Sequence, residues 1–74
     1  GALGHAKKDG APLRSSASWD PKTVVGKMDR CATLKMLRIR QAKGGGAVVE
    51  FEYKGETRFM HCLDLAHGAV ACGD

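Results

Sequence analysis

Alternation of apolar and polar residues after Leu34 is the feature that most constrains how this chain can fold. Three stretches, residues 34–40, 47–53 and 57–63, place apolar side chains at every second position. A period of two is typical of strands with one buried face. Glycine-containing turns separate the stretches. The sequence therefore predicts an antiparallel meander of three strands, with residues 69–72 as a candidate fourth.

The two predicted hairpins agree on a register that separates apolar from charged side chains. With the first hairpin centred on its glycine run, Arg38 pairs with Glu50. With the second centred on Gly55, Phe51 pairs with Phe59. Because a slip of one residue exchanges the two faces of a strand, this agreement fixes the predicted faces. The apolar face is Leu37, Ile39, Val49, Phe51, Tyr53, Phe59 and Leu63, and the mixed-charge face carries Arg38, Arg40, Glu50, Glu52 and Arg58.

Residues 21–32 have the pattern of an amphipathic helix. Asp20 is a good N-cap, and Pro21 falls at the first helical position, where its missing N–H costs nothing. Trp19 and Val24 have the spacing of a hydrophobic staple. An amphipathic sheet needs a second layer over its apolar face. We therefore predict an α+β fold, in which one N-terminal helix packs on a three- to four-stranded antiparallel meander.

Residues 1–18 show neither a helical nor a strand period. They contain three glycines, one proline and three serines. We predict a disordered leader or tag-derived segment there, followed by one small domain over residues 19–74. Residues 2–6, followed by Lys7 and Lys8, resemble the end of a signal peptide, although a cloning scar explains them equally well.

Three cysteines in a chain of 74 residues favour an oxidising compartment. Cys31, Cys62 and Cys72 allow one disulfide and a free thiol. A last hairpin centred on His67 would place Cys62 opposite Cys72. We prefer a bridge from Cys31 to Cys72, because it would tie the predicted helix to the end of the chain. A fully reduced cytoplasmic chain is the alternative.

The same residues suggest a zinc site as an alternative to a disulfide. Cys62, His67 and Cys72 have the spacing of the last three ligands of a zinc-knuckle pattern. The position expected for the first ligand holds Phe59, which cannot bind metal. Cys31 or His61 would have to complete the tetrahedral set through space.

Charge suggests two kinds of partner. The chain carries a net charge of +4, with seven basic residues and one acid between Lys22 and Lys43. A basic nucleic-acid-binding domain would use Lys35, Arg38, Arg40 and Arg58, but its aromatic residues should then be exposed beside them. The predicted register instead places the aromatic residues on the opposite face, so a protein partner is favoured.

Recognisable catalytic motifs are missing from the sequence. It contains no Gly-x-Ser-x-Gly, His-Glu-x-x-His or P-loop pattern, and its serines lie only in residues 15–18. No apolar run is long enough to cross a bilayer. We therefore expect a small, disulfide-stabilised, non-enzymatic module without a cofactor, secreted or periplasmic, that binds a protein partner. Its predicted surfaces are an exposed strand edge and the mixed-charge face of Lys35, Arg38, Arg40, Glu50, Glu52 and Arg58.

Overall fold

All strands that the computed structural model describes, over residues 2–69, belong to one antiparallel sheet. They are β1 (Leu3–Ala6), β2 (Ala11–Arg14), β3 (Val24–Met28), β4 (Thr33–Gln41), β5 (Ala47–Tyr53), β6 (Glu56–His61) and β7 (Leu65–His67). Two single turns of 3-10 helix, η1 (Pro21–Thr23) and η2 (Cys62–Asp64), lie between strands. The predicted α+β class is therefore wrong, because the described part of the chain is all-β.

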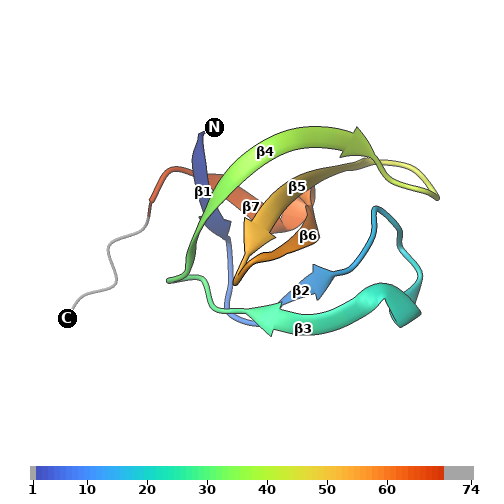
Figure 1. Ribbon diagram of the computed structural model, residues 1–74, viewed down its shortest axis with the longest axis horizontal. Coiled ribbons are helices and arrows are strands. Elements are labelled where there is room, and N and C mark those ends of the chain that lie inside the picture. The colour runs from blue at the N-terminus through green and yellow to red at the C-terminus, as the bar shows by residue number, and fades with distance from the viewer. Residues whose placement is uncertain (1, 70–74) are drawn as a thin grey trace.

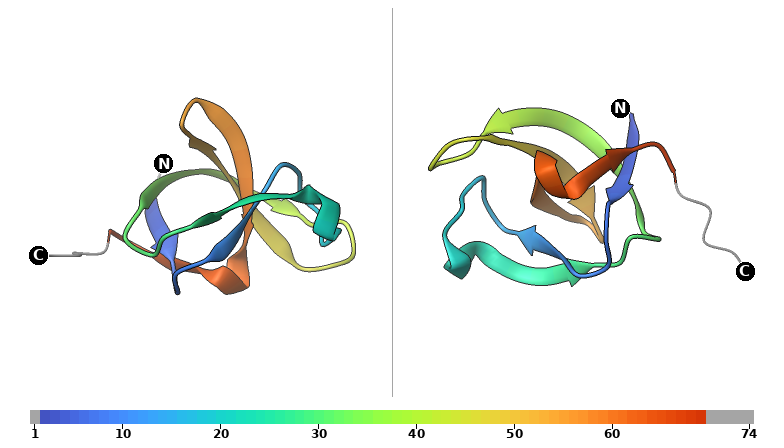
Figure 2. Two further views of the ribbon diagram at one scale, coloured as in Figure 1. Left: turned by 90° about the horizontal axis from the view of Figure 1, so that it is seen from below. Right: turned by 180° about the vertical axis from the view of Figure 1, so that it is seen from behind.

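The sheet curls round on itself (Figures 1 and 2). Its strand order is β3-β2-β6-β5-β4-β1-β7. β1 and β2 are consecutive in the chain, yet β6, β5 and β4 lie between them in the sheet. A flat sheet would hold them several strand widths apart, whereas only residues 7–10 connect them. The curl brings the two strands together and creates a concave face.

A small apolar core fills this concave face. Phe51 and Met60 are fully buried, and Met28 is 1% exposed. These three side chains come from β5, β6 and β3, so the core joins strands from both halves of the chain. The buried cluster consists of Ala6, Ala11, Leu13, Met28, Leu34, Val49, Phe51, Met60 and Leu65.

The predicted helix over residues 21–32 is replaced by η1 and the edge strand β3. Asp20 does cap the turn, since its carboxylate accepts a hydrogen bond from the Lys22 backbone N–H at 2.9 Å. The turn then ends, because the β-branched Val24 and Val25 favour extended backbone. β3 pairs with β2. The prediction that Asp20 caps a helical turn is confirmed. The residues that follow the turn pair as a strand and do not continue the helix.

The predicted leader is also ordered. Residues 1–18 contain β1 and β2, and they bury Ala6, Ala11 and Leu13 in the core. Each strand is four residues long, which is too short to show a clear period. Their pairing partners are strands later in the chain, including β4, β6 and β7.

The predicted register of the first hairpin is largely confirmed. Arg38 pairs with Glu50, and Ile39 pairs with Val49. An irregularity between Met36 and Arg38 then shifts the ladder, so that Phe51 pairs with Met36 instead of Leu37. Leu37 is the extra residue of this bulge.

The predicted register of the second hairpin is wrong by one residue. Lys54 and Gly55 form a two-residue turn in which both residues have positive φ, 51° and 81°. Such turns match the twist of the flanking strands better than the tight three-residue turn, Lys54 to Glu56, that centring the hairpin on Gly55 implied. Phe51 therefore pairs with Arg58 instead of Phe59, and Met60 takes the predicted place of Phe59 in the core.

At the C-terminal end, β7 pairs with β1, a strand that the sequence did not predict. The candidate strand at residues 69–72 lies almost wholly outside the described residues.

Candidate protein-binding groove

The second half of β4 exposes two large apolar side chains. Ile39 is 70% exposed and Leu37 is 52% exposed. Ile39 pairs with Val49, which is only 2% exposed, so the two point to the same side of the sheet. Ile39 thus lies on the core face, at the point where the core is no longer covered.

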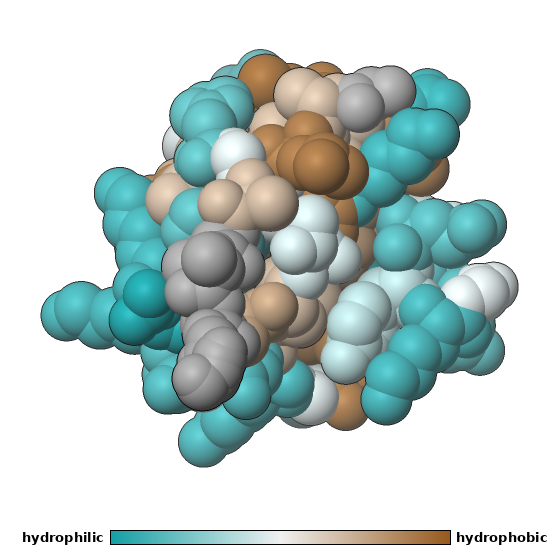
Figure 3. All heavy atoms as spheres, turned by 90° about the vertical axis from the view of Figure 1, so that its left-hand side faces the viewer, coloured by the Kyte–Doolittle hydropathy of each residue, from teal (hydrophilic) through white to brown (hydrophobic). Residues whose placement is uncertain are grey.

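A groove of about 370 Å³ opens at this place. We call it the β4 groove, and it is lined by Ala2, Met36, Leu37, Arg38, Ile39, Val49, Cys62, Leu65 and His67. Val49 and Leu65 also belong to the buried core, so the groove continues the core to the surface. Figure 3 shows apolar side chains gathered near the top of one face, on the side where β4 lies in Figure 1.

The edge of β4 beside the groove is open in the part of the chain that the structure describes. β1 pairs with β4 only at its start, over Thr33–Lys35. The last hydrogen bond on this side runs from the Met36 N–H to the Ala2 carbonyl, at 2.9 Å. From Leu37 to Gln41, β4 is paired with β5 alone among the described residues. The next hydrogen bond on the open side runs from the Lys43 N–H to the Ala17 carbonyl. The predicted exposed strand edge therefore lies directly beside the β4 groove.

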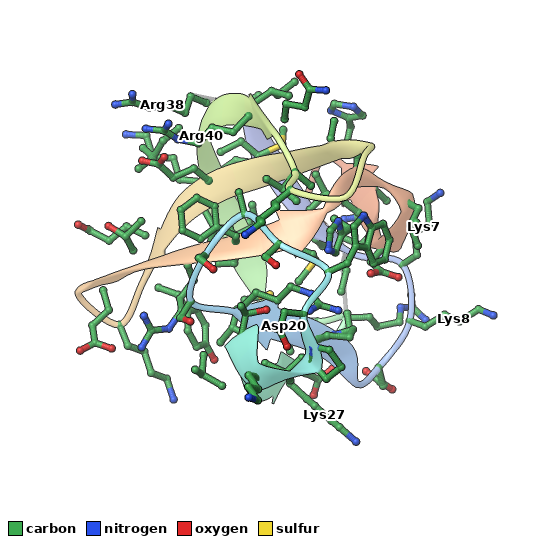
Figure 4. All side chains as sticks on the ribbon, turned by 90° about the vertical axis from the view of Figure 1, so that its right-hand side faces the viewer. Lys7, Lys8, Asp20, Lys27, Arg38 and Arg40 are labelled. Atoms are coloured by element: carbon green, nitrogen blue, oxygen red, sulfur yellow. The ribbon has the colours of Figure 1, made fainter. Side chains whose placement is uncertain are left out.

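Positive charge lies on the other face of β4. The Arg40 guanidinium donates to Glu50 at 2.5 Å, and the Arg38 guanidinium lies 3.6 Å from the same carboxylate. Glu50 is nearly buried, whereas both arginines are largely exposed. Figure 4 shows Arg38 and Arg40 projecting close together at one edge of the molecule. Two arginines share one carboxylate, which leaves an excess of positive charge.

The structure brings together five of the six predicted mixed-charge residues. Lys35 pairs with Glu52 on the same face as the cluster of Arg38, Arg40 and Glu50. Arg58 lies on the opposite face, because it pairs with the core residue Phe51. Its guanidinium instead forms an ion pair with Glu56 on its own strand. The one-residue error in the second hairpin accounts for this difference.

The predicted cysteine and zinc constellation is not assembled within residues 2–69. Cys62 is a half-buried free thiol in η2. His67 is exposed at the end of β7, and both residues line the β4 groove. No group of three or more potential metal ligands occurs among the described residues. Cys72, which completes both the zinc set and the pairing with Cys31, lies outside them.

A stacked pair that sequence reasoning missed anchors the opposite side of the sheet. The Trp19 and His61 rings stack with centroids 3.5 Å apart, and the Trp19 indole N–H donates to the Gly45 carbonyl at 2.8 Å. Trp19 therefore does not form the predicted staple with Val24. A Cβ added at Gly44 would lie 3.2 Å from the indole, so the glycine run admits the ring.

His61 is only 2% exposed beneath this indole. Burial lowers the pKa of its imidazole, because the charged form loses hydration. The Arg14 guanidinium lowers the pKa further, against a hydrogen bond to the Ser18 carbonyl at 3.1 Å. His61 Nδ1 and Arg14 Nε are both buried without a hydrogen-bond partner. This environment favours a neutral structural histidine.

No helix among the described residues has the length and apolar character needed to cross a membrane. No protein-family model, curated protein or solved structure matches this chain, so its function has to be inferred from the groove and its surroundings.

Proposed function

We propose that this chain is a non-enzymatic module that binds a protein partner in the β4 groove, and that it works in a secreted or periplasmic setting. The observation that carries the proposal is the exposure of Ile39 and Leu37 beside a groove continuous with the core. Exposed apolar surface of this kind, bordered by charged groups, is typical of interaction sites. The cysteine content supports the choice of compartment.

The dimensions of the groove favour a side chain or short segment over a broad protein face. Its volume of about 370 Å³ is at the small end of the range for ligand pockets. Burial of one or two apolar side chains there would supply most of the binding free energy, as is usual where few residues dominate an interface.

The proposal is tested with a library of random peptides displayed for binding to the full chain. Ile39→Glu places a charge in the groove, and Val25→Glu is the matched control, because Val25 is 51% exposed on the edge strand β3. We expect selected peptides to bind wild type and V25E alike and to bind I39E at least about tenfold more weakly. Peptides that bind all three proteins equally would contradict the proposal.

A nucleic-acid partner is the second candidate, because Arg38 and Arg40 leave positive charge unbalanced beside Glu50. The basic groups are divided, however: Figure 4 shows Lys7, Lys8 and Lys27 projecting away from Arg38 and Arg40. Phe51 is buried, and the exposed indole of Trp19 is stacked on His61. Oligonucleotide binding at low salt that weakens steeply as salt is added would favour this candidate.

A further inference from the structure

We propose that the segment bound in the β4 groove is an extended strand that adds to the open edge of β4 and carries acidic side chains facing Arg38 and Arg40. This inference rests on the proposed function and specifies the partner's conformation and charge. Strand addition supplies main-chain hydrogen bonds, and the alternate side chains then determine specificity.

The backbone of β4 offers hydrogen-bonding groups at defined positions. The Ala42 N–H donates to the Gly46 carbonyl, which marks a hydrogen-bonded pair at the end of the hairpin. Bonded and non-bonded pairs alternate along an antiparallel ladder. Arg40, which pairs with Val48, therefore directs its backbone groups to β5. By the same alternation, Arg38 also faces β5, whereas Ile39 and Gln41 present N–H and C=O groups to the open edge.

The place of an added strand is set by β1. Within the described residues, β1 occupies this side of β4 as far as the hydrogen bond from the Met36 N–H to the Ala2 carbonyl. The next residue, Leu37, is the extra residue of the bulge. An incoming strand would therefore lie beside Leu37–Gln41, in line with β1, and would extend an existing sheet position.

Alternation along the incoming strand specifies its side chains. Residues opposite Ile39 point into the β4 groove and should be apolar. Residues opposite Arg38 and Arg40 point to the other face, where two guanidinium groups share the Glu50 carboxylate. Opposite charges directly across a strand pair stabilise it, so acidic residues fit there. The occupant is thus an extended segment in which apolar and acidic residues alternate.

A second copy of this chain fits the same edge poorly. Symmetric antiparallel pairing of two β4 edges must centre on a residue, because paired residues share one side of the sheet. Centring on Arg38 or Arg40 sets that arginine opposite itself, and centring on Ile39 sets Arg38 opposite Arg40. Registers centred on Leu37 or Gln41 would run along Met36 or Lys43, whose N–H groups already bond to the Ala2 and Ala17 carbonyls. Like charges directly opposite each other destabilise a strand pair. The arginines therefore select against self-association and for an acidic partner.

The experiment uses a short peptide in which valine and glutamate alternate. Two controls are a peptide in which lysine replaces glutamate, and a peptide of the same composition in scrambled order. We expect the alternating acidic peptide to bind at least about tenfold more tightly than either control. Amide hydrogen exchange, read residue by residue, should slow at Ile39 and Gln41. Arg38 and Arg40 serve as internal controls, because their amides already face β5.

Backbone methylation tests the hydrogen bonds directly. Two peptides are compared, one with N-methyl groups on its odd-numbered residues and one with N-methyl groups on its even-numbered residues. Methylation of the amides that face β4 should abolish binding, whereas methylation of the amides that face away should leave it unchanged. Unchanged binding of both methylated peptides, equal binding of the acidic and lysine peptides, or unchanged exchange at Ile39 and Gln41 would overturn strand addition by an acidic partner. A stable dimer without peptide, with slowed exchange at Ile39, would overturn the assignment of the occupant.

The Cys62 thiol separates this inference from the proposed function. Cys62 lines the groove, so a bound segment should protect it from alkylation, as followed by mass mapping of the Cys62 peptide. Protection of Cys62 in wild type but not in I39E, with binding insensitive to methylation, would support groove binding and refute strand addition. Library peptides that bind I39E as well as wild type would refute both.

Discussion

At the scale of single residues, the least expected feature is the stack of Trp19 on the buried His61. The indole joins three segments that are far apart in sequence, because it contacts His61 at the end of β6 and donates to Gly45 in the β4–β5 loop. The sequence offered no local pattern for this contact. The glycine run on which we centred the first hairpin also provides the space that the ring needs.

His61 should make the stability of the fold depend on pH. Its pKa in the folded state is lowered from 6.5, so the unfolded chain binds more protons as pH falls below that value. Stability should therefore be unaffected by His61 above pH 6.5 and should decrease as pH falls toward its folded-state pKa. His61→Gln keeps a side-chain N–H for the Ser18 carbonyl and should flatten the dependence. Denaturant unfolding of wild type and H61Q between about pH 5.5 and 7.5 tests this.

The variant His67→Gln is the control for this measurement. His67 is exposed at the end of β7 and takes no part in the stack of Trp19 on His61, so H67Q shows whether loss of a histidine elsewhere changes the measurement. If the unfolding free energy varied with pH equally in wild type and H61Q, His61 would not be the source of the pH dependence.

At the scale of elements, the sequence predicts strands well where a turn is unambiguous and poorly where two turn lengths compete. The β4–β5 register follows from the glycine run, and Arg38 does pair with Glu50. The β5–β6 register depends on whether the turn holds two residues or three, and the hydrophobic pattern fitted both, since Phe59 and Met60 are each apolar. η1 shows a similar limit, because a good cap at Asp20 begins a helix but cannot extend it.

Lys54→Asn should stabilise the protein by about 0.5 kcal/mol, because asparagine adopts positive φ more readily than lysine and is preferred before glycine in two-residue turns. Lys54 has a φ of 51°, and its ammonium lies 5.3 Å from the centre of the Tyr53 ring. Loss of that exposed contact offsets part of the gain. We expect the thermal midpoint to rise by roughly 2–4 °C. Lys54→Ala is the control: it loses the contact with the Tyr53 ring without gaining the preferred turn residue, so it should not be stabilised. A lower thermal midpoint for K54N than for wild type would contradict the proposed turn.

At the scale of the whole molecule, the candidate site was predictable only in part. The charged pattern of β4 and β5 is visible in the sequence, and so is the idea of an exposed strand edge. The groove is not, because it depends on which part of β4 the described residues of β1 cover and on how β7 and η2 approach β4. Strands as short as β1 and β7 acquire their positions from pairing rather than from their own residues. The curl of the sheet thus defines both the core and the place where it opens.

A chain of this size has little core, so a covalent link should matter to its stability. Cys62 is a free thiol, and the bridge that we propose is the one preferred from the sequence, between Cys31 and Cys72. In the chain-entropy model a bridge closing so long a loop contributes roughly 3–4 kcal/mol, a large share of the stability of a small domain. We expect Cys31→Ser to lose about that much in denaturant unfolding, whereas Cys62→Ser, which keeps the bridge, should lose far less. Alkylation without reduction, followed by peptide mapping, should label Cys62 alone. Labelling of all three cysteines in protein recovered from its native compartment would refute the bridge. It would also remove the main reason for placing this module outside the cytoplasm.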